Sequence, residues 1–521
     1  MATSRPRFPT RTFSSIGVAI ALTAAILTPA AARPTETVSP TPPEQQVTAA
    51  STLQAGSPRG DLRPKLRWST CRDDPDEQCA RFVVPRSWSN PSLGSFNLAV
   101  RRLPATGPHV IGTMFTNPGG PGEPGTELIA AFKGDTALRN RFNIVSWDPR
   151  GVPTTRPGLT DCPQPRELPT SLLTGPFTWG QVAAARQASE AQSGAVCLAM
   201  NSVLARYLGT NDVVRDLDAL RAAVGDRQLT YVGYSYGTTI GRTYALTFPT
   251  RVRAMILDSV TAPQAVMGTY LVNQGMGGAT AWPMILRSLP PGIGGVYTRL
   301  IAKLQTRTIM VDKQRVSRWD MWSQAINAGR SSASLAAFPA AICTLARAAG
   351  MSEPACRKRT GTRAELKLAI TRTRALMYGS PALRLINCAD MSGRPTNSQV
   401  AASLTRFGGA SGPEAASNVL NFSTMCSGLP QAWNQIPRLS ESRPVTLPSP
   451  PLLINSTGDV ATPYAGAQSD RRTMVGSRLI TVRSTFHGFF GVTQSACIDG
   501  PALGYLITRT LPTRDISCPS P

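Results

Sequence analysis

The sequence predicts an α/β protein with a mainly parallel sheet that is interrupted by a large, mostly helical insertion. Strand patterns alternate with helical material as far as residue 257. The alternation then stops, and it resumes near residue 451. Strands that alternate with helices imply a parallel sheet covered on both faces, and the interruption implies a cap that lies over that sheet.

The first part of the predicted sheet precedes the insertion. Strand patterns occur at residues 82–85, 96–103, 110–116, 142–147, 228–233 and 252–257. We expect the first two to pair as edge strands. A helix is predicted at 213–224, because Val213, Leu217 and Leu220 recur on one helical face. Residues 61–262 are therefore expected to form the first part of the core.

The insertion and the end of the chain complete the predicted organisation. Residues 263–445 carry helical patterns, four of the ten cysteines and no convincing run of strands. Strand patterns return at 451–456 and 479–483, and a helix is expected at about 498–509. We therefore expect a helical cap at 263–445 and the C-terminal part of the core at 446–521.

The N-terminal residues predict export. Arginines precede an apolar run at 16–27, and Ala30-Ala31-Ala32 offers a cleavage site, so residues 1–32 are expected to be a signal peptide. Residues 33–60 are rich in Pro, Thr and Ser, which is typical of a disordered leader. We expect a secreted protein, found outside the cell or associated with the cell wall, with no integral membrane contact. An uncleaved N-terminal anchor is the alternative.

The ten cysteines fit an oxidising compartment, because an even number in an exported chain normally forms disulfides. Proximity in the sequence suggests five pairs, although it does not determine the connectivity. The suggested pairs are Cys71–Cys79, Cys162–Cys197, Cys343–Cys356, Cys388–Cys426 and Cys497–Cys518. With two histidines in the chain and no clustered Cys/His spacing, neither a zinc site nor another cofactor is expected.

The formal net charge of +24 raises the question of an anionic partner. No dense basic run with interleaved aromatic residues indicates a nucleic-acid surface. Electrostatic adhesion to an anionic cell envelope is one interpretation. A general preference for arginine on a solvated surface is the other. We expect a monomer.

The stretch Gly233-Tyr234-Ser235-Tyr236-Gly237 provides a candidate nucleophile. A G-x-S-x-G pattern alone is weak, but here a predicted strand precedes it and a predicted helix follows it. A strand that turns sharply into a helix through serine lifts the hydroxyl out of the sheet. The free N–H groups at the start of the helix then face a developing oxyanion. Ser235 is therefore the predicted nucleophile.

The candidate base and its orienting acid follow later strands. His487 lies just past the carboxyl end of the last predicted strand, whereas His109 lies at the start of a strand, away from the ligand crevice. Asp459 also follows the carboxyl end of a strand, and the order Ser235, Asp459, His487 matches that of α/β-hydrolase triads. Asp258 is the alternative acid.

An oxyanion hole needs two backbone N–H donors aimed at one point. One is expected from Tyr236, directly after the nucleophile. The other is expected from the loop Asn117-Pro118-Gly119-Gly120-Pro121-Gly122, which follows a predicted strand. Glycine lets that backbone approach a substrate closely, and proline stiffens the loop.

Together these motifs resemble the secreted tripeptidyl aminopeptidases of actinobacteria, α/β-hydrolases related to the prolyl aminopeptidases. The resemblance covers residue 67 to the C-terminus and is densest in NPGGPG, WDPRG, DLDALR to GYSYGT, GDVATPYAGA and the tail from His487. It implies an α/β-hydrolase core with a mainly parallel sheet and a helical cap. It also implies the triad Ser235, Asp459 and His487, with the oxyanion N–H from Gly120.

Three departures from the family pattern concern the substrate pocket more than the chemistry. Phe486 stands where a glycine usually precedes the histidine, WDPRG continues as VPTTRPG, and the GGPG loop continues as EPG. The front of the predicted cap, residues 262–330, shows little that aligns with the family.

The resemblance implies a serine exopeptidase that acts on peptides with a free N-terminus. Such an enzyme needs a carboxylate to bind the α-ammonium group. Glu123 and Asp390 are the candidates, and each could instead be a surface or structural acid. A carboxylesterase with the same triad and a non-catalytic binding protein are the alternatives.

Overall fold

The structure is a computed structural model that describes residues 66–263, 266–359, 361–378, 380–410 and 412–521. The predicted signal peptide and leader lie outside the described residues. Among the residues described, the helices are all too short or too polar to span a bilayer.

A ten-stranded sheet forms the centre of the α/β part of the described chain, in the order β1-β2-β3-β5-β4-β6-β7-β11-β13-β14. The pairs β1–β2, β2–β3 and β3–β5 are antiparallel, and the pairs from β5 through to β14 are parallel. The predicted, mainly parallel sheet is confirmed. The strands are β1 (Ser69–Thr70), β2 (Gln78–Pro85), β3 (Ser95–Leu103), β4 (Gly112–Asn117), β5 (Phe142–Trp147), β6 (Leu229–Tyr234), β7 (Val252–Asp258), β11 (Leu452–Ser456), β13 (Arg478–Val482) and β14 (Ile516–Cys518).

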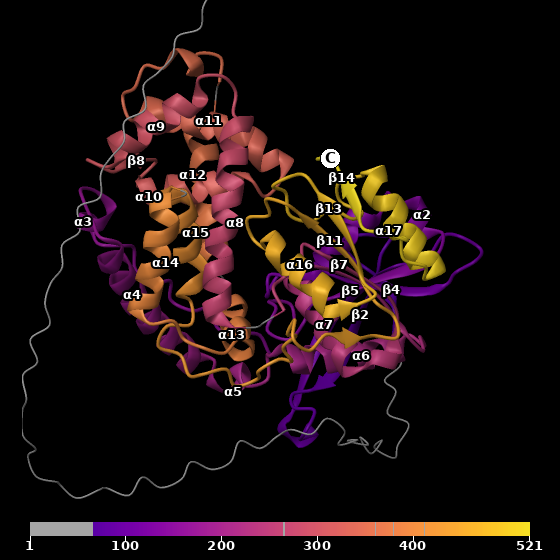
Figure 1. The fold of residues 1–521 in the computed structure, drawn as a ribbon. Coiled ribbons are helices and arrows are strands. Elements are labelled where there is room, and N and C mark those ends of the chain that lie inside the picture. Colours follow the sequence, from indigo (N-terminus) through magenta and orange to yellow (C-terminus); the bar gives the residue numbers. More distant parts are fainter. Residues whose placement is uncertain (1–65, 264–265, 360, 379, 411) are drawn as a thin grey trace, which may run out of the picture. The chain divides into compact units, whose positions relative to one another are not determined.

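Side chains of the central strands alternate between two apolar layers. In β7, Met255 and Leu257 pack in the layer that includes helices α6 (Thr210–Ala223) and α7 (Tyr236–Thr247). Ala254 and Ile256 pack in the opposite layer, with helix α17 (Ala496–Thr508). Figure 1 shows α6 and α17 on opposite sides of the strands. Because both faces are covered, these strands read as almost continuous apolar runs.

The chain between β7 and β11 is mostly helical. Its helices are α8 (Met267–Ser288), α9 (Ile293–Leu304), α10 (Arg318–Ala328), α11 (Ser332–Ala348), α12 (Arg363–Tyr378), α13 (Pro381–Asp390), α14 (Asn397–Ala410) and α15 (Pro413–Ser423). Strands β8 (Ile309–Val311) and β9 (Gln314–Val316) form a small antiparallel hairpin among them. Long helices α8 and α15 pack side by side (Figure 1).

A segment that precedes β6 in the chain shares the core of these helices. Helix α4 (Trp179–Met200) contributes Val182 and Ala183 to the same apolar cluster. The ring of Trp179 meets that of Trp319 edge to face, with 6.1 Å between the centroids. The sequence did not predict the packing of α4 against these helices, because the segments in contact are far apart in the chain. The remaining short elements are α1 (Gly125–Leu128), α2 (Thr136–Arg139), α3 (Thr170–Leu173), α5 (Ser202–Ala205), β10 (Val445–Thr446), α16 (Tyr464–Thr473) and β12 (Met474–Val475).

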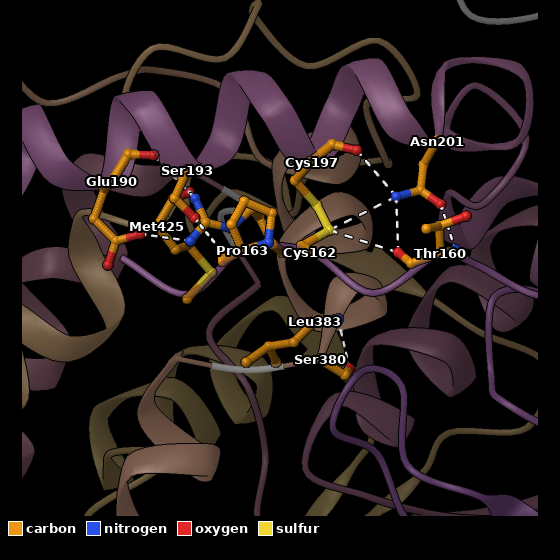
Figure 2. The surroundings of a disulfide bond; sticks show 11 residues. Thr160, Cys162, Pro163, Glu190, Ser193, Cys197, Asn201, Ser380, Leu383 and Met425 are labelled. Carbon is orange, nitrogen blue, oxygen red and sulfur yellow. Dashed lines mark hydrogen bonds and ion pairs between the residues drawn. A yellow bond between two sulfur atoms is a disulfide. The ribbon is translucent and has the colours of Figure 1, made fainter. Parts of the chain in front are cut away.

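All five suggested disulfides are present. Figure 2 shows Cys162–Cys197, which ties the loop after β5 to α4. Asn201 supports the link: its side-chain amide donates to the carbonyl oxygens of Thr160 (3.1 Å) and Cys197 (3.0 Å). One turn before Cys197 in α4, Ser193 donates to the carbonyl oxygen of Pro163 at 2.5 Å. This loop is therefore fixed by one covalent bond and several polar contacts.

The motifs WDPRG and DLDALR meet in a buried ion pair. Arg150 donates to both carboxylate oxygens of Asp216, with N–O distances of 2.7 and 2.5 Å, and both side chains are essentially inaccessible to solvent. Arg150 also donates to the carbonyl oxygens of Arg86 and Tyr207. The pair thus joins α6 to the loops that follow β2 and β5.

Candidate active site

Ser235 lies at the sharp turn between β6 and α7. Its backbone has φ 55° and ψ −123°, a strained combination for a residue with a side chain. A Cβ on Gly233 would collide with the carbonyl group of Gly237, so the turn requires glycine there. The N–H of Ser235 donates to the carbonyl oxygen of Asp258 at 3.0 Å. The G-x-S-x-G stretch therefore adopts the strand–turn–helix geometry predicted for it.

The glycine-rich loop after β4 packs directly against this turn. A Cβ on Gly119 would lie 2.6 Å from the carbonyl oxygen of Tyr234, and one on Gly237 would lie 2.6 Å from that of Asn117. The loop is held by a hydrogen bond of 3.0 Å from the N–H of Gly119 to the side chain of Asn117. Only residues without a Cβ permit this approach.

Asp459 and His487 form a hydrogen-bonded pair. Nδ1 of His487 lies 2.9 and 3.0 Å from the two carboxylate oxygens of Asp459. The carboxylate is buried, and it also accepts hydrogen bonds from the backbone N–H groups of Ala461 (2.8 Å) and Thr462 (2.9 Å). A carboxylate held in this way fixes the imidazole with Nε2 free to take up a proton.

The histidine is fixed by its own backbone as well. The N–H of His487 donates to the carbonyl oxygen of Arg330 at 2.9 Å. The next residue, Gly488, donates to the hydroxyl oxygen of Ser259 at 2.7 Å. The alternative acid, Asp258, accepts from the backbone of this loop and does not orient the ring.

One cavity brings the elbow, the glycine-rich loop and the acid loop together. Gly120, Ser235 and Tyr236 line it beside Ala461 and Thr462, and its volume is about 90 Å³. The opposite wall comes from α8, α13 and the residues around them: Thr269, Tyr270, Asn273, Gln274, Leu383, Asn387 and Asp390. A larger cavity of about 380 Å³, lined by α4 and α10 residues, contains none of the predicted catalytic residues.

The structure brings Asp459 and His487 into contact, and it places Ser235 in the cavity that Thr462 also lines. Thr462 Oγ1 lies 3.3 Å from Nδ1 of His487. Among the described residues, Ser235 Oγ makes no hydrogen bond to the imidazole. In free enzymes such contacts are often long and tighten only when substrate binds.

Comparison with known proteins agrees with this geometry. The family model described as alpha/beta hydrolase fold matches residues 114–308, and the model described as TAP-like protein matches residues 413–518. These two segments contain Ser235 and both members of the Asp459–His487 pair. The chain has the α/β-hydrolase fold, with a TAP-like C-terminal segment.

Several curated proteins resemble parts of this α/β-hydrolase. Serine protease Hip1 of Mycobacterium tuberculosis is 37% identical over 215 residues, which are 39% of this chain and 41% of that protein. Tripeptidyl aminopeptidase of Streptomyces lividans is 31% identical over 222 residues, 40% of this chain and 41% of that protein. Carboxylesterase B of M. tuberculosis is 29% identical over 234 residues, 42% and 44% of the two chains. The similarity thus spans about two fifths of each relative's length.

Among solved structures, a hydrolase from Pseudomonas aeruginosa is 14% identical, with a TM-score of 0.29 over 81% of this chain and 92% of that one. Esterase E22 is 13% identical, with a TM-score of 0.38 over 82% of this chain and 100% of that one.

The two candidate acids for an α-ammonium group differ in environment. Asp390 is buried in the wall of the cavity that Ser235 lines, and it accepts hydrogen bonds from the N–H (2.9 Å) and hydroxyl (2.6 Å) of Thr210. Burial raises the pKa of Asp390 to about 7. Glu123 is exposed, beside the glycine-rich loop. His109 is exposed too, ahead of β4.

No pattern in the sequence predicted two features of this site. Thr210 Oγ1 forms a short hydrogen bond with the Tyr236 hydroxyl, which connects Asp390 to the residue after the nucleophile. Arg330 lines the cavity and holds the histidine loop through its carbonyl group. Within the described ranges, no group of three or more His, Cys, Asp or Glu side chains is arranged to hold a metal ion.

Proposed function

We propose that this α/β-hydrolase is a secreted serine exopeptidase that releases short peptides, tripeptides among them, from free N-termini. The observation that carries the proposal is the Asp459–His487 pair on the loops next to a strained Ser235 elbow. The five disulfides support export, since such bonds persist in oxidising compartments. Two of the relatives are named serine protease and tripeptidyl aminopeptidase.

In the proposed reaction Ser235 Oγ attacks the carbonyl carbon of the scissile amide while Nε2 of His487 takes its proton. Asp459 stabilises the imidazolium, and the N–H groups of Gly120 and Tyr236 donate to the oxyanion. His487 then gives the proton to the leaving amine as the C–N bond breaks. Water, activated by the same imidazole, releases the peptide from Ser235.

The α-ammonium group of the substrate would be bound by a carboxylate. Asp390 is our preferred candidate, because it lines the cavity that contains Ser235. Glu123 remains the second candidate; it lies on the exposed side of the glycine-rich loop.

We further propose that residues 1–32 are removed, that 61–262 and 446–521 form the catalytic core with 263–445 as its cap, and that the mature enzyme acts as a monomer.

A carboxylesterase is the second candidate, since a relative with 29% identity is named Carboxylesterase B and the same triad serves both reactions. The mature enzyme should be compared with its Ser235→Ala variant on a free tripeptidyl anilide, its N-acetyl form and a simple acyl ester. Loss of a charge-assisted hydrogen bond of about 1.5–3 kcal/mol should slow the N-acetyl substrate at least tenfold. Equal kcat/KM for the two peptides, or turnover of the ester alone, would contradict the exopeptidase.

A further inference from the structure

Arg330 stands beside the catalytic histidine and in the wall of the catalytic cavity. It follows α10 by two residues, and its carbonyl oxygen accepts the N–H of His487 at 2.9 Å. Arg330 lines the cavity that contains Ser235, and it also lines a small neighbouring cavity with Asn327 and Phe422. A group bound by Arg330 would therefore lie within the substrate site.

The guanidinium group of Arg330 lacks a partner. Within the described part of the chain it makes neither a hydrogen bond nor an ion pair, and the carboxylates of Asp459 and Glu123 act on it only at longer range. Arg242 lines the same cavity but is paired: it donates to the carboxylate of Asp470 at 2.7 Å. The two arginines thus differ in whether their charge is compensated within the protein.

The nearby carboxylates do not supply the missing partner. Asp459 already accepts hydrogen bonds from His487, Ala461 and Thr462, and Glu123 is exposed to solvent. Arg330 is partly buried; partial removal of an unpaired cation from water is costly and lowers the pKa of its guanidinium group. An anionic ligand would offset this cost.

We propose that Arg330 binds a carboxylate of the substrate, either an acidic side chain in the acyl part or the terminal carboxylate of a short leaving peptide. The planar guanidinium group presents paired N–H donors that match the two oxygens of a carboxylate. The assignment rests on the proposed acylation of Ser235. It makes Arg330 a specificity-determining residue for substrates with a negative charge close to the scissile bond.

Two substrate series separate the sources of the carboxylate. The first comprises free tripeptidyl anilides that differ by Glu or Gln at one position, so that the acyl part alone carries the charge. The second comprises tetrapeptides with a free acid or an amide at the C-terminus. We expect the wild-type enzyme to favour the acidic member at least tenfold in kcat/KM in one series, and Arg330→Gln to reduce that ratio to about one. Arg330→Lys should retain part of it, because it keeps the charge without the planar fork.

Arg287→Gln is the matched control, because Arg287 is exposed on α8; its ratios should equal those of the wild type. No acidic preference in either series, or a preference that survives Arg330→Gln in a variant with wild-type melting temperature, would overturn the assignment. If the enzyme cleaves esters and no peptides, the exopeptidase proposal fails. The role of Arg330 is then tested by comparing kcat/KM for a hemisuccinate ester with kcat/KM for its neutral butyrate counterpart. Binding can also be compared without turnover. A fluorophosphonate labels Ser235, and the readout is how strongly a Glu-containing and a Gln-containing tripeptide amide each protect Ser235 from that labelling.

Discussion

The carboxylate of Asp258 accepts a hydrogen bond of 2.9 Å from the backbone N–H of Phe489, two residues beyond His487. The same oxygen accepts the N–H of Phe490 at 2.8 Å. Asp258 is buried at the end of β7, the strand next to β6 and its elbow. The turn that supports Ser235 is thereby tied to the loop that carries His487.

The first prediction concerns this tie. Asp258→Ala should destabilise the protein by roughly 2–4 kcal/mol, since it leaves two buried N–H groups without acceptors. It should also lower kcat/KM more than tenfold, because the histidine loop loses its anchor. Asp258→Asn keeps an acceptor oxygen and should retain most of the stability. Denaturant unfolding and steady-state kinetics measure both effects; an active, stable Asp258→Ala variant would show that the loop is held by other contacts.

The second prediction tests the triad itself. Ser235→Ala, Asp459→Asn and His487→Ala should each lose most of the activity, by a factor of 10³ or more, while circular dichroism shows an unchanged fold. Because the three residues act as a unit, double variants should be little worse than the worst single one. His109→Ala is the control, since His109 is exposed ahead of β4. Full activity in His487→Ala would exclude the proposed mechanism.

The third prediction concerns the buried Arg150–Asp216 pair. Replacing Arg150 with Met leaves Asp216 as an uncompensated buried charge and should cost about 3–5 kcal/mol of stability. The double change with Asp216→Leu should recover part of that loss, because it removes the orphaned charge as well. Thermal unfolding of Arg150→Met, Asp216→Leu and the double variant gives the coupling energy between the two side chains. Equal losses in both would mean that the hydrogen bonds to Arg86 and Tyr207 matter more than the ion pair.

The sheet and the candidate triad were predictable because their signals are local. Ser235, Asp459 and His487 each lie in the turn or loop that follows a strand, and parallel strands bring such positions to one edge of a sheet. The cysteine pairs were suggested by short separations, and each pair joins neighbouring elements of the fold.

The contacts that shape the pocket were not predictable in this way. Thr210 and Asp390 are 180 positions apart and meet only where the end of α13 reaches the start of α6. The carbonyl group of Arg330 and the N–H of His487 likewise come from distant parts of the chain. Neither Thr210 nor Arg330 belongs to a sequence motif. Tertiary packing, and not a local turn, brings each of them to the cavity. The residues that shape the substrate pocket are therefore harder to predict from this sequence than the candidate triad.

The fourth prediction uses the buried carboxyl group of Asp390, whose pKa is raised to about 7 by burial. A carboxyl group with a raised folded-state pKa binds its proton more tightly in the folded chain than in the unfolded chain. Its contribution to stability is therefore largest at acidic pH and falls as the pH rises from about 4 to about 7. Asp258 and Asp470, each with a pKa raised to about 6, act in the same direction.

Asp390→Asn removes one of these titrations while keeping an oxygen that can accept from Thr210. The loss of melting temperature between pH 5 and pH 8 should therefore be smaller in Asp390→Asn than in the wild type, with the remainder due to the other carboxyl groups whose pKa burial raises. Asp161→Asn, a change at an exposed position, should leave the pH dependence unaltered. Scanning calorimetry at both pH values checks this. A pH dependence that is identical in Asp390→Asn and the wild type would mean that Asp390 stays ionised when buried, held so by the two hydrogen bonds from Thr210.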